Sequence, residues 1–282
     1  MIDIWYKFIE FCFPFSWTHY VFMKNALLAI ILISPVFAQM GTLVVNNRMV
    51  FFSDVLAHST LASLAIGVIF GFQEPSLVMI GFAVLLAIAI NFLKKMSNLS
   101  MDTVLGILSA FIVALGVVIL SRQGGFSKFS TYLIGDILSI STEQLASIIF
   151  LWVIVFWFWY KYGNKLILMS VNASLARSRG INIFWLETSF TVLLAIVIMV
   201  NIKLVGILIM NSLLVIPAAA SRNISRNIKT YTLSAVLISV ISGITGLIFS
   251  YYWGTASGAT IVIFLTLSYV ITLIYAKILQ SR

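Results

Sequence analysis

Long apolar stretches separated by short polar breaks follow one another along almost the whole chain. A helix needs roughly 20 apolar residues to cross a hydrocarbon core of about 30 Å, and most of these stretches approach that length. The pattern predicts an all-α fold, a polytopic transmembrane helical bundle of about eight or nine spans in one domain over residues 1–282. We expect the spans at 26–45, 49–72, 77–93, 103–120, 145–160, 183–200, 204–219, 231–252 and 258–276.

The segments outside these spans differ in character. Residues 1–19 mix aromatic side chains with charges, which favours a short interfacial helix at the level of the lipid headgroups. The stretch 161–182 is a long soluble segment, and 221–229 is basic. Pro217 should end or kink the helix before it, so that a short basic helix could follow and dock a partner. The alternative is an ordinary basic loop.

Composition and charge restrict the class of protein. Hydrophobic residues make up 62% of the chain and charged residues only 9%, whereas soluble domains carry about 25% charged residues. The net charge of +9 does not indicate nucleic-acid binding, because the basic residues lie scattered in short loops. Such loops stay on the cytoplasmic side of a membrane. We therefore expect the cytoplasmic segments at 48, 94–95, 161–179, 222–229 and the C-terminus.

One ionisable pair lies inside a predicted span. Asp54 and His58 are four residues apart, so on a helix they share one face. With a helix starting near Arg48, Asp54 would lie roughly 9 Å and His58 roughly 15 Å along it. Ionisable groups at such depth are costly and usually functional. A carboxylate and an imidazole together can bind a divalent cation, and without a thiolate Zn²⁺ or Mn²⁺ fits better than Cu⁺.

Two other interpretations of this pair stay open. The pair could handle protons, or it could only hold helices together through buried hydrogen bonds. Two ligands are also too few for a tight metal site, so a second subunit or another helix would have to supply the rest. Cys12 is the single cysteine, which excludes an intramolecular disulfide and a Cys-rich metal motif.

Three further polar residues are candidates for a transport pathway. Asp102 opens a span, where a carboxylate would also offset the helix dipole. Asp136 lies in a predicted outer segment and could receive a cation or cap a helix. Asn211 lies in the middle of an apolar stretch and could line the pathway or join two helices.

The sequence also lacks several catalytic motifs. No Walker-type phosphate loop is present, so we expect that the chain does not hydrolyse ATP by itself. Neither an HExxH nor a GxSxG element occurs, which argues against a membrane protease or hydrolase. The chain is thus expected not to be an enzyme.

Five segments carry recognisable motifs in a fixed order: Arg48–His58, Asp102–Ile107, Tyr132–Leu138, Val205–Arg222 and Gly254–Gly258. Together they resemble the permease subunits of bacterial zinc and manganese ABC transporters, the zinc-uptake permease family. The likeness covers almost the whole length. The zinc branch often has a histidine in the fourth span, whereas Ser109, Ala110 and Phe111 occupy that stretch here.

The resemblance implies an assembly in a bacterial plasma membrane. It implies two copies of this permease, two ABC ATPase subunits and an extracytoplasmic metal-binding protein. Asp54 and His58 would coordinate the transported ion, with zinc favoured and manganese or iron as alternatives, and no permanently bound cofactor is expected. The coupling segment that docks the ATPase would be 221–229, with the residues Pro217, Ala220, Ser221 and Arg222.

A different class of transporter remains the main alternative. A stand-alone proton-coupled transporter or channel could use the same Asp54 and His58 pair and would need no ATPase. A neighbouring gene for an ATPase and another for a binding protein would favour the ABC importer.

Overall fold

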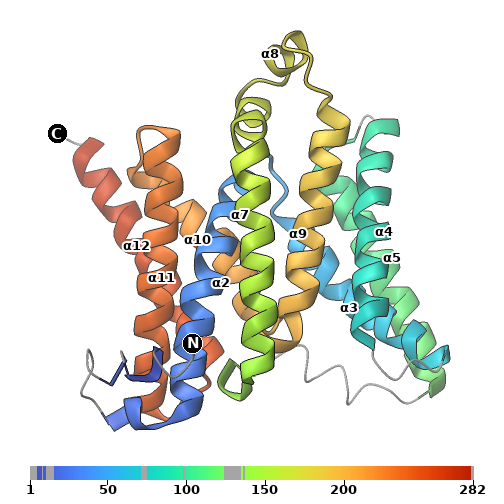
Figure 1. Cartoon of the computed structure of the whole chain (residues 1–282). Coiled ribbons are helices and arrows are strands. Elements are labelled where there is room, and N and C mark those ends of the chain that lie inside the picture. Colours follow the sequence, from blue (N-terminus) through green and yellow to red (C-terminus); the bar gives the residue numbers. More distant parts are fainter. Residues whose placement is uncertain are drawn as a thin grey trace. The chain divides into compact units, whose positions relative to one another are not determined.

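The computed structural model describes residues 5–7, 9–10, 16–70, 75–97, 99–123, 135 and 137–280 (Figure 1). Within these ranges the chain is helical and contains no strand. The long helices are α2 (Val21–Asn46), α3 (Phe51–Ile69), α4 (Pro75–Met96), α5 (Met101–Gln123), α7 (Thr142–Val171), α9 (Ile183–Val205), α10 (Ile207–Ile224), α11 (Ile228–Trp253) and α12 (Ser257–Gln280); the short ones are η1 (Ser16–His19), η2 (Ile137–Ser139) and α8 (Ala173–Ser178).

The prediction of a multi-pass helical membrane protein is confirmed. Among the described helices, eight are long and apolar enough to cross a membrane, and α3 is a shorter apolar helix. Each of the nine predicted spans corresponds to one helix, and α3 is the shorter one among them. The interfacial position predicted for residues 1–19 stays a prediction.

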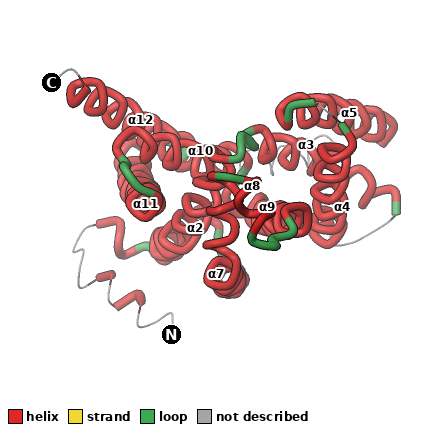
Figure 2. Tube along the Cα trace, turned by 90° about the horizontal axis from the view of Figure 1, so that it is seen from above, coloured by secondary structure: helices red, strands yellow, loops and turns green. Residues whose placement is uncertain are grey.

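The chain divides into two compact units, and the division passes through α2, α7 and α10. Unit 1 is Met1–Thr42, Asp136–Val153 and Ser212–Arg282, and unit 2 is Leu43–Gly135 and Ile154–Asn211. In unit 1, α11 packs along α12. In unit 2, α3 packs against α4 and α5, and α4 packs against α9 (Figure 2). That residues 1–282 act as one permease domain stays a prediction.

Three predicted helix ends are wrong. Helix α7 continues to Val171 through most of the expected soluble stretch, where the ammonium of Lys161 lies 5.1 Å from the ring centre of Trp157. Helix α9 continues through 201–203, because the buried amide of Asn201 donates to the Val197 carbonyl at 2.8 Å. Helix α10 runs past Pro217 to Ile224, so no separate helix follows the proline.

The first described residues dock on the start of α2. The Trp5 indole donates to the Lys24 carbonyl at 3.2 Å, and the Tyr6 hydroxyl donates to Asn25 Oδ1 at 2.6 Å. Lys24 is buried and forms an ion pair with Glu10. The hydrogen bond and the positive charge of Lys24 lower the pKa of Glu10 below its usual range. The pairing explains how a lysine can lie inside an apolar helix bundle.

One glycine allows two helices of unit 1 to approach closely. A Cβ at Gly41 of α2 would lie 1.8 Å from the carbonyl oxygen of Leu214 in α10. Only a residue without a side chain allows the two backbones to approach this closely. Gly41 therefore fixes where α10 packs on α2 within this unit.

Candidate functional site

The turn before α3 fixes where this helix begins. The N–H of Met49 bonds the Val44 carbonyl at 2.9 Å, and that of Arg48 bonds the Val45 carbonyl at 3.2 Å. This pattern, with Arg48 in the left-handed region at φ 55°, is a Schellman ending of α2. Helix α3 then starts at Phe51, three residues later than Arg48, and Asp54 falls in its first turn.

The late start corrects the expected depth of the pair. Counted from Phe51 at about 1.5 Å per residue, Asp54 lies about 4–5 Å and His58 about 10 Å along α3. A carboxylate in the first turn is stabilised in its charged form by the helix dipole. Asp54 therefore lies at the N-terminal end of a mostly apolar helix.

Other polar residues of α3 form hydrogen bonds within the helix. The hydroxyls of Ser59, Thr60 and Ser63 are buried, and each donates to a carbonyl three residues earlier at 2.6–3.0 Å. Such bonds remove the cost of burying a hydroxyl in an apolar bundle. Asp54 and His58 differ from them, since Asp54 is only half buried and His58 is exposed. The α3 face that carries the pair is thus open to a ligand.

Asn211 of α10 is brought to this pair. Its amide Nδ2 donates a hydrogen bond to Oδ1 of Asp54, and both residues belong to unit 2. The bond leaves the second carboxylate oxygen and the exposed imidazole of His58 on one helix face. Cβ atoms four residues apart on a helix are about 5–6 Å from each other. This spacing allows one oxygen and one nitrogen to bind the same divalent cation.

A sharp junction between α9 and α10 sets the position of Asn211. Helix α9 ends at Gly206, whose φ of 83° is available mainly to glycine, and α10 begins at the next residue. A Cβ on Gly135, which has φ 63°, would lie 2.2 Å from the Gly206 nitrogen. Gly135 and Val205–Gly206 belong to two separate motifs of the sequence that meet here. Asn211 follows in the second turn of α10.

The other predicted pathway residues are not brought to Asp54 by any described contact. Asp102 is exposed in the first turn of α5, a position that suits an interaction with the helix dipole. Asp136 lies outside the described residues. Within the described part of the chain, no group of three or more His, Cys, Asp or Glu side chains could hold a metal ion. The additional ligands expected from the sequence therefore have no candidate among these side chains.

The end of α10 forms a tight corner with α11. The hydroxyl of Ser221 is buried, donates to the Tyr231 carbonyl at 2.6 Å and lies 2.6 Å from the hydroxyl of Ser234. Asn227 and Thr230 form a capping box that starts α11. Pro217 and Ala220 are buried, whereas Arg222 is exposed. Hydrogen bonds of buried groups thus hold the corner together, and the basic Arg222 is exposed on its surface.

These features describe a multi-pass helical membrane protein, and the comparison with known proteins shows its family. Residues 19–276 match the model of the ABC 3 transport family, and the chain belongs to this family. It is therefore a subunit of an ABC transporter, not an enzyme, and a multi-pass protein of the plasma membrane.

Relatives in sequence and a solved structure are similar to this chain over most of its length. The high-affinity zinc uptake system membrane protein ZnuB of Haemophilus influenzae is 34% identical, over 88% of this chain and 95% of its own length. The manganese transport system membrane protein MntC of Listeria monocytogenes is 26% identical, over 91% of both chains. A structure of PsaBC from Streptococcus pneumoniae in complex with Fab superposes with a TM-score of 0.76 at 22% identity, covering 96% of this chain and 95% of that one.

Proposed function

We propose that this chain is the permease subunit of an ATP-driven importer of divalent metal ions, with zinc as the substrate. The observation that carries the proposal is the open carboxylate and imidazole of Asp54 and His58 on one face of α3. The relative named as a zinc uptake protein has the higher identity, 34%, against 26% for the one named as a manganese transporter. Manganese, or iron, remains the alternative substrate.

The proposed site removes part of the hydration shell of the ion. One oxygen of Asp54 and a ring nitrogen of neutral His58 bind it, while Asn211 holds the other oxygen of the same carboxylate. Outer hydrogen bonds of this kind orient a ligating carboxylate. Protonation of His58 would release the ion, because only the neutral imidazole is a ligand. A second copy of the chain would supply the ligands that this copy lacks.

The energy would come from other subunits. An extracytoplasmic binding protein delivers the ion, and an ABC ATPase docks on the cytoplasmic corner of α10 and α11. The buried part of that corner, Pro217, Ala220 and Ser221, would pass movement into α10, which also carries Asn211. Arg222 would contact the ATPase. Asp102 and Asp136 would lie along the route of the ion.

Metal-limited growth tests the substrate and the mechanism together. A bacterium without its own zinc and manganese importers would express the chain with an ABC ATPase and a metal-binding protein from the same organism as the chain. We expect growth at limiting zinc, little growth at limiting manganese, and no rescue when the ATPase is left out. If the chain rescued growth only at limiting manganese, the substrate would be manganese and not zinc. Rescue without the ATPase would support a proton-coupled transporter and contradict the proposal.

A further inference from the structure

A basic hollow lies where the end of α4 meets the start of α9 in unit 2. Its volume is about 400 Å³, and its lining includes Lys94, Lys95, Arg177, Asn182, Phe184 and Glu187. We call it the α4–α9 pocket. Lys94 and Lys95 stand in the last turn of α4, and Arg177 comes from α8. None of these residues has a role in the proposed metal site.

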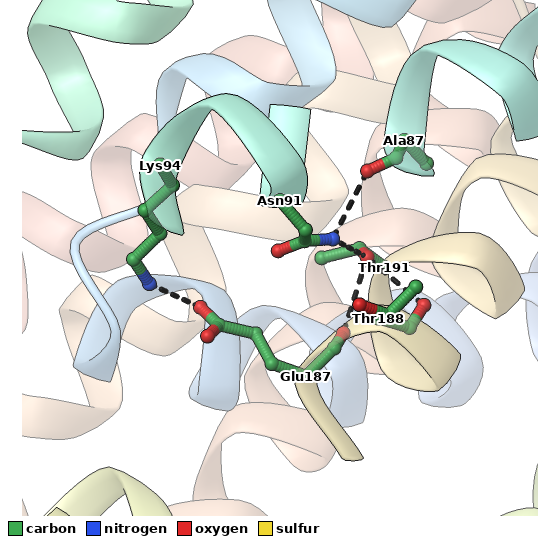
Figure 3. A network of polar contacts seen from close by, with 6 residues as sticks. All are labelled: Ala87, Asn91, Lys94, Glu187, Thr188 and Thr191. Atoms are coloured by element: carbon green, nitrogen blue, oxygen red, sulfur yellow. Dashed lines mark hydrogen bonds and ion pairs between the residues drawn. The ribbon is translucent and has the colours of Figure 1, made fainter. Parts of the chain in front are cut away.

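The charges of the pocket do not balance. Lys94 forms an ion pair with Glu187, which is the only carboxylate among the described lining residues (Figure 3). Lys95 lies over the ring of Phe184, with its ammonium 4.9 Å from the ring centre. Arg177 is exposed. Two positive charges therefore remain after the pair is counted, and the pocket attracts an anion.

A buried network holds the wall of the pocket in place. The amide of Asn91 donates to Thr191 Oγ1 at 2.5 Å and to the Ala87 carbonyl at 3.0 Å (Figure 3). Three residues on, the ion pair of Lys94 and Glu187 joins the same two helices. Asn91 of α4 contacts Thr191 of α9, and Lys94 contacts Glu187, so the residue numbers rise along α4 while they fall along α9. The two helices therefore run antiparallel. Lys94 and Lys95 thus stand on a braced pair of helices, whereas Arg177 comes from α8.

An exposed apolar stripe leads to this pocket along α4. Leu85, Ile88 and Phe92 are 69%, 43% and 54% exposed, and their spacing of three and four residues places them on one helix face. Lys95 follows three residues after Phe92 on the same face. In a membrane-spanning helix such a face contacts acyl chains, and a cation at its end lies at the headgroups. Trp185, 68% exposed near the start of α9, suits the same level.

We infer that the α4–α9 pocket binds the phosphate headgroup of an anionic phospholipid of the cytoplasmic leaflet. The phosphate lies between Lys95 and Arg177, and an acyl chain follows the stripe of Leu85, Ile88 and Phe92. Basic pockets between helices on the cytoplasmic side are known to bind anionic headgroups. The excess of Lys and Arg at this end of the helices places the pocket on that side. The lipid would brace α4 against α9.

Native mass spectrometry of the full-length chain in detergent tests the site with added phosphatidylglycerol. Each cation near a phosphate contributes about a fivefold change in affinity. The double variant Lys95→Gln/Arg177→Gln should therefore bind roughly 25-fold more weakly. The matched control Arg226→Gln/Lys277→Gln removes one arginine and one lysine that are exposed elsewhere, and it should bind like the wild type.

A second variant separates charge from misfolding. Glu187→Gln removes the carboxylate and frees Lys94, so it should bind phosphatidylglycerol roughly fivefold more tightly. Phosphatidylcholine should bind weakly to every variant, and inorganic phosphate should not displace the lipid. The proposal is overturned if the double variant binds like the wild type, if Glu187→Gln gives no gain, or if inorganic phosphate competes fully. Because metal plays no part in these measurements, they do not depend on the proposed function.

Discussion

Asn211 donates a hydrogen bond to the carboxylate of Asp54, joining α10 to α3 within one unit. Removing a hydrogen bond that orients a metal-ligating carboxylate typically lowers affinity or activity about 10–100-fold. We expect Asn211→Leu to raise the KM for zinc uptake by roughly that factor. Uptake of ⁶⁵Zn into cells that express the whole transporter, at matched permease levels, measures the change.

A double-mutant cycle shows whether Asn211 acts through Asp54. If it does, Asn211→Leu added to Asp54→Ala should lower uptake little further, because the positioned group is already gone. Independent losses that multiply would mean that Asn211 acts on the ion or the fold by another route.

The two proposed ligands give a second prediction. Asp54→Ala and His58→Ala should each strongly reduce uptake of zinc and manganese, because each removes one donor atom from an already small ligand set. The chain has two histidines, and the other one, His19, is exposed in η1. His19→Ala is therefore the matched control and should keep uptake. If Asp54→Ala and His58→Ala both took up metal at the wild-type rate, these two residues would not form the metal site.

The periodic part of the structure could be predicted from the sequence, because helix count and membrane crossing depend on local hydrophobicity. Helix ends were harder, since one span was expected to end before Asn201, and Pro217 was expected to end or kink its helix. Asn201 instead bonds the carbonyl four residues earlier, and α10 accommodates Pro217. Both outcomes depend on the surroundings of the residue rather than on its type.

The partners in the contacts between helices could not be predicted, although Asn211 was a candidate for joining two helices. Asp54 was found as an unusual charge in an apolar stretch, but nothing in its neighbourhood points to Asn211, 157 residues away. Lys94 and Glu187 are likewise 93 residues apart. The glycine motifs were the one available signal, since Gly135 and Gly206 each adopt a positive φ, and their backbones meet.

Gly41 provides a third prediction, on stability. Gly41→Ala places a Cβ 1.8 Å from a backbone oxygen of Leu214, and overpacking of this kind costs about 1–3 kcal/mol. Gly81→Ala in α4 meets nothing within 4 Å, and alanine is about 0.5–1 kcal/mol better than glycine inside a helix. Thermal unfolding in detergent should thus show a lower Tm for the first variant and an equal or higher Tm for the second. Equal Tm values for both variants would mean that α2 and α10 are not in tight contact.

The corner of α10 and α11 gives a fourth prediction. Arg222 is exposed beside the buried Ser221, so Arg222→Glu should disrupt docking of the ATPase without unfolding the permease. The proportion of ATPase that co-purifies with the permease measures this. Lys277→Glu reverses an exposed charge on α12 and should leave co-purification unchanged. If both charge reversals reduce co-purification equally, the loss results from the change in overall charge and not from a lost docking contact.

The buried pair Asn91 and Thr191 gives a fifth prediction. Both side chains are buried, and the Asn91 amide donates to the Thr191 hydroxyl at 2.5 Å. Thr191→Val leaves that amide with the Ala87 carbonyl alone, and interhelical hydrogen bonds in membranes average about 0.6 kcal/mol. Asn91→Leu should cost a similar amount.

Combining the two changes should cost less than their sum, because replacing both partners by apolar groups removes the unpaired donor and acceptor together. Denaturant unfolding of the four proteins in one detergent gives the interaction energy. Strict additivity would mean that the bond does not stabilise the pairing of α4 and α9.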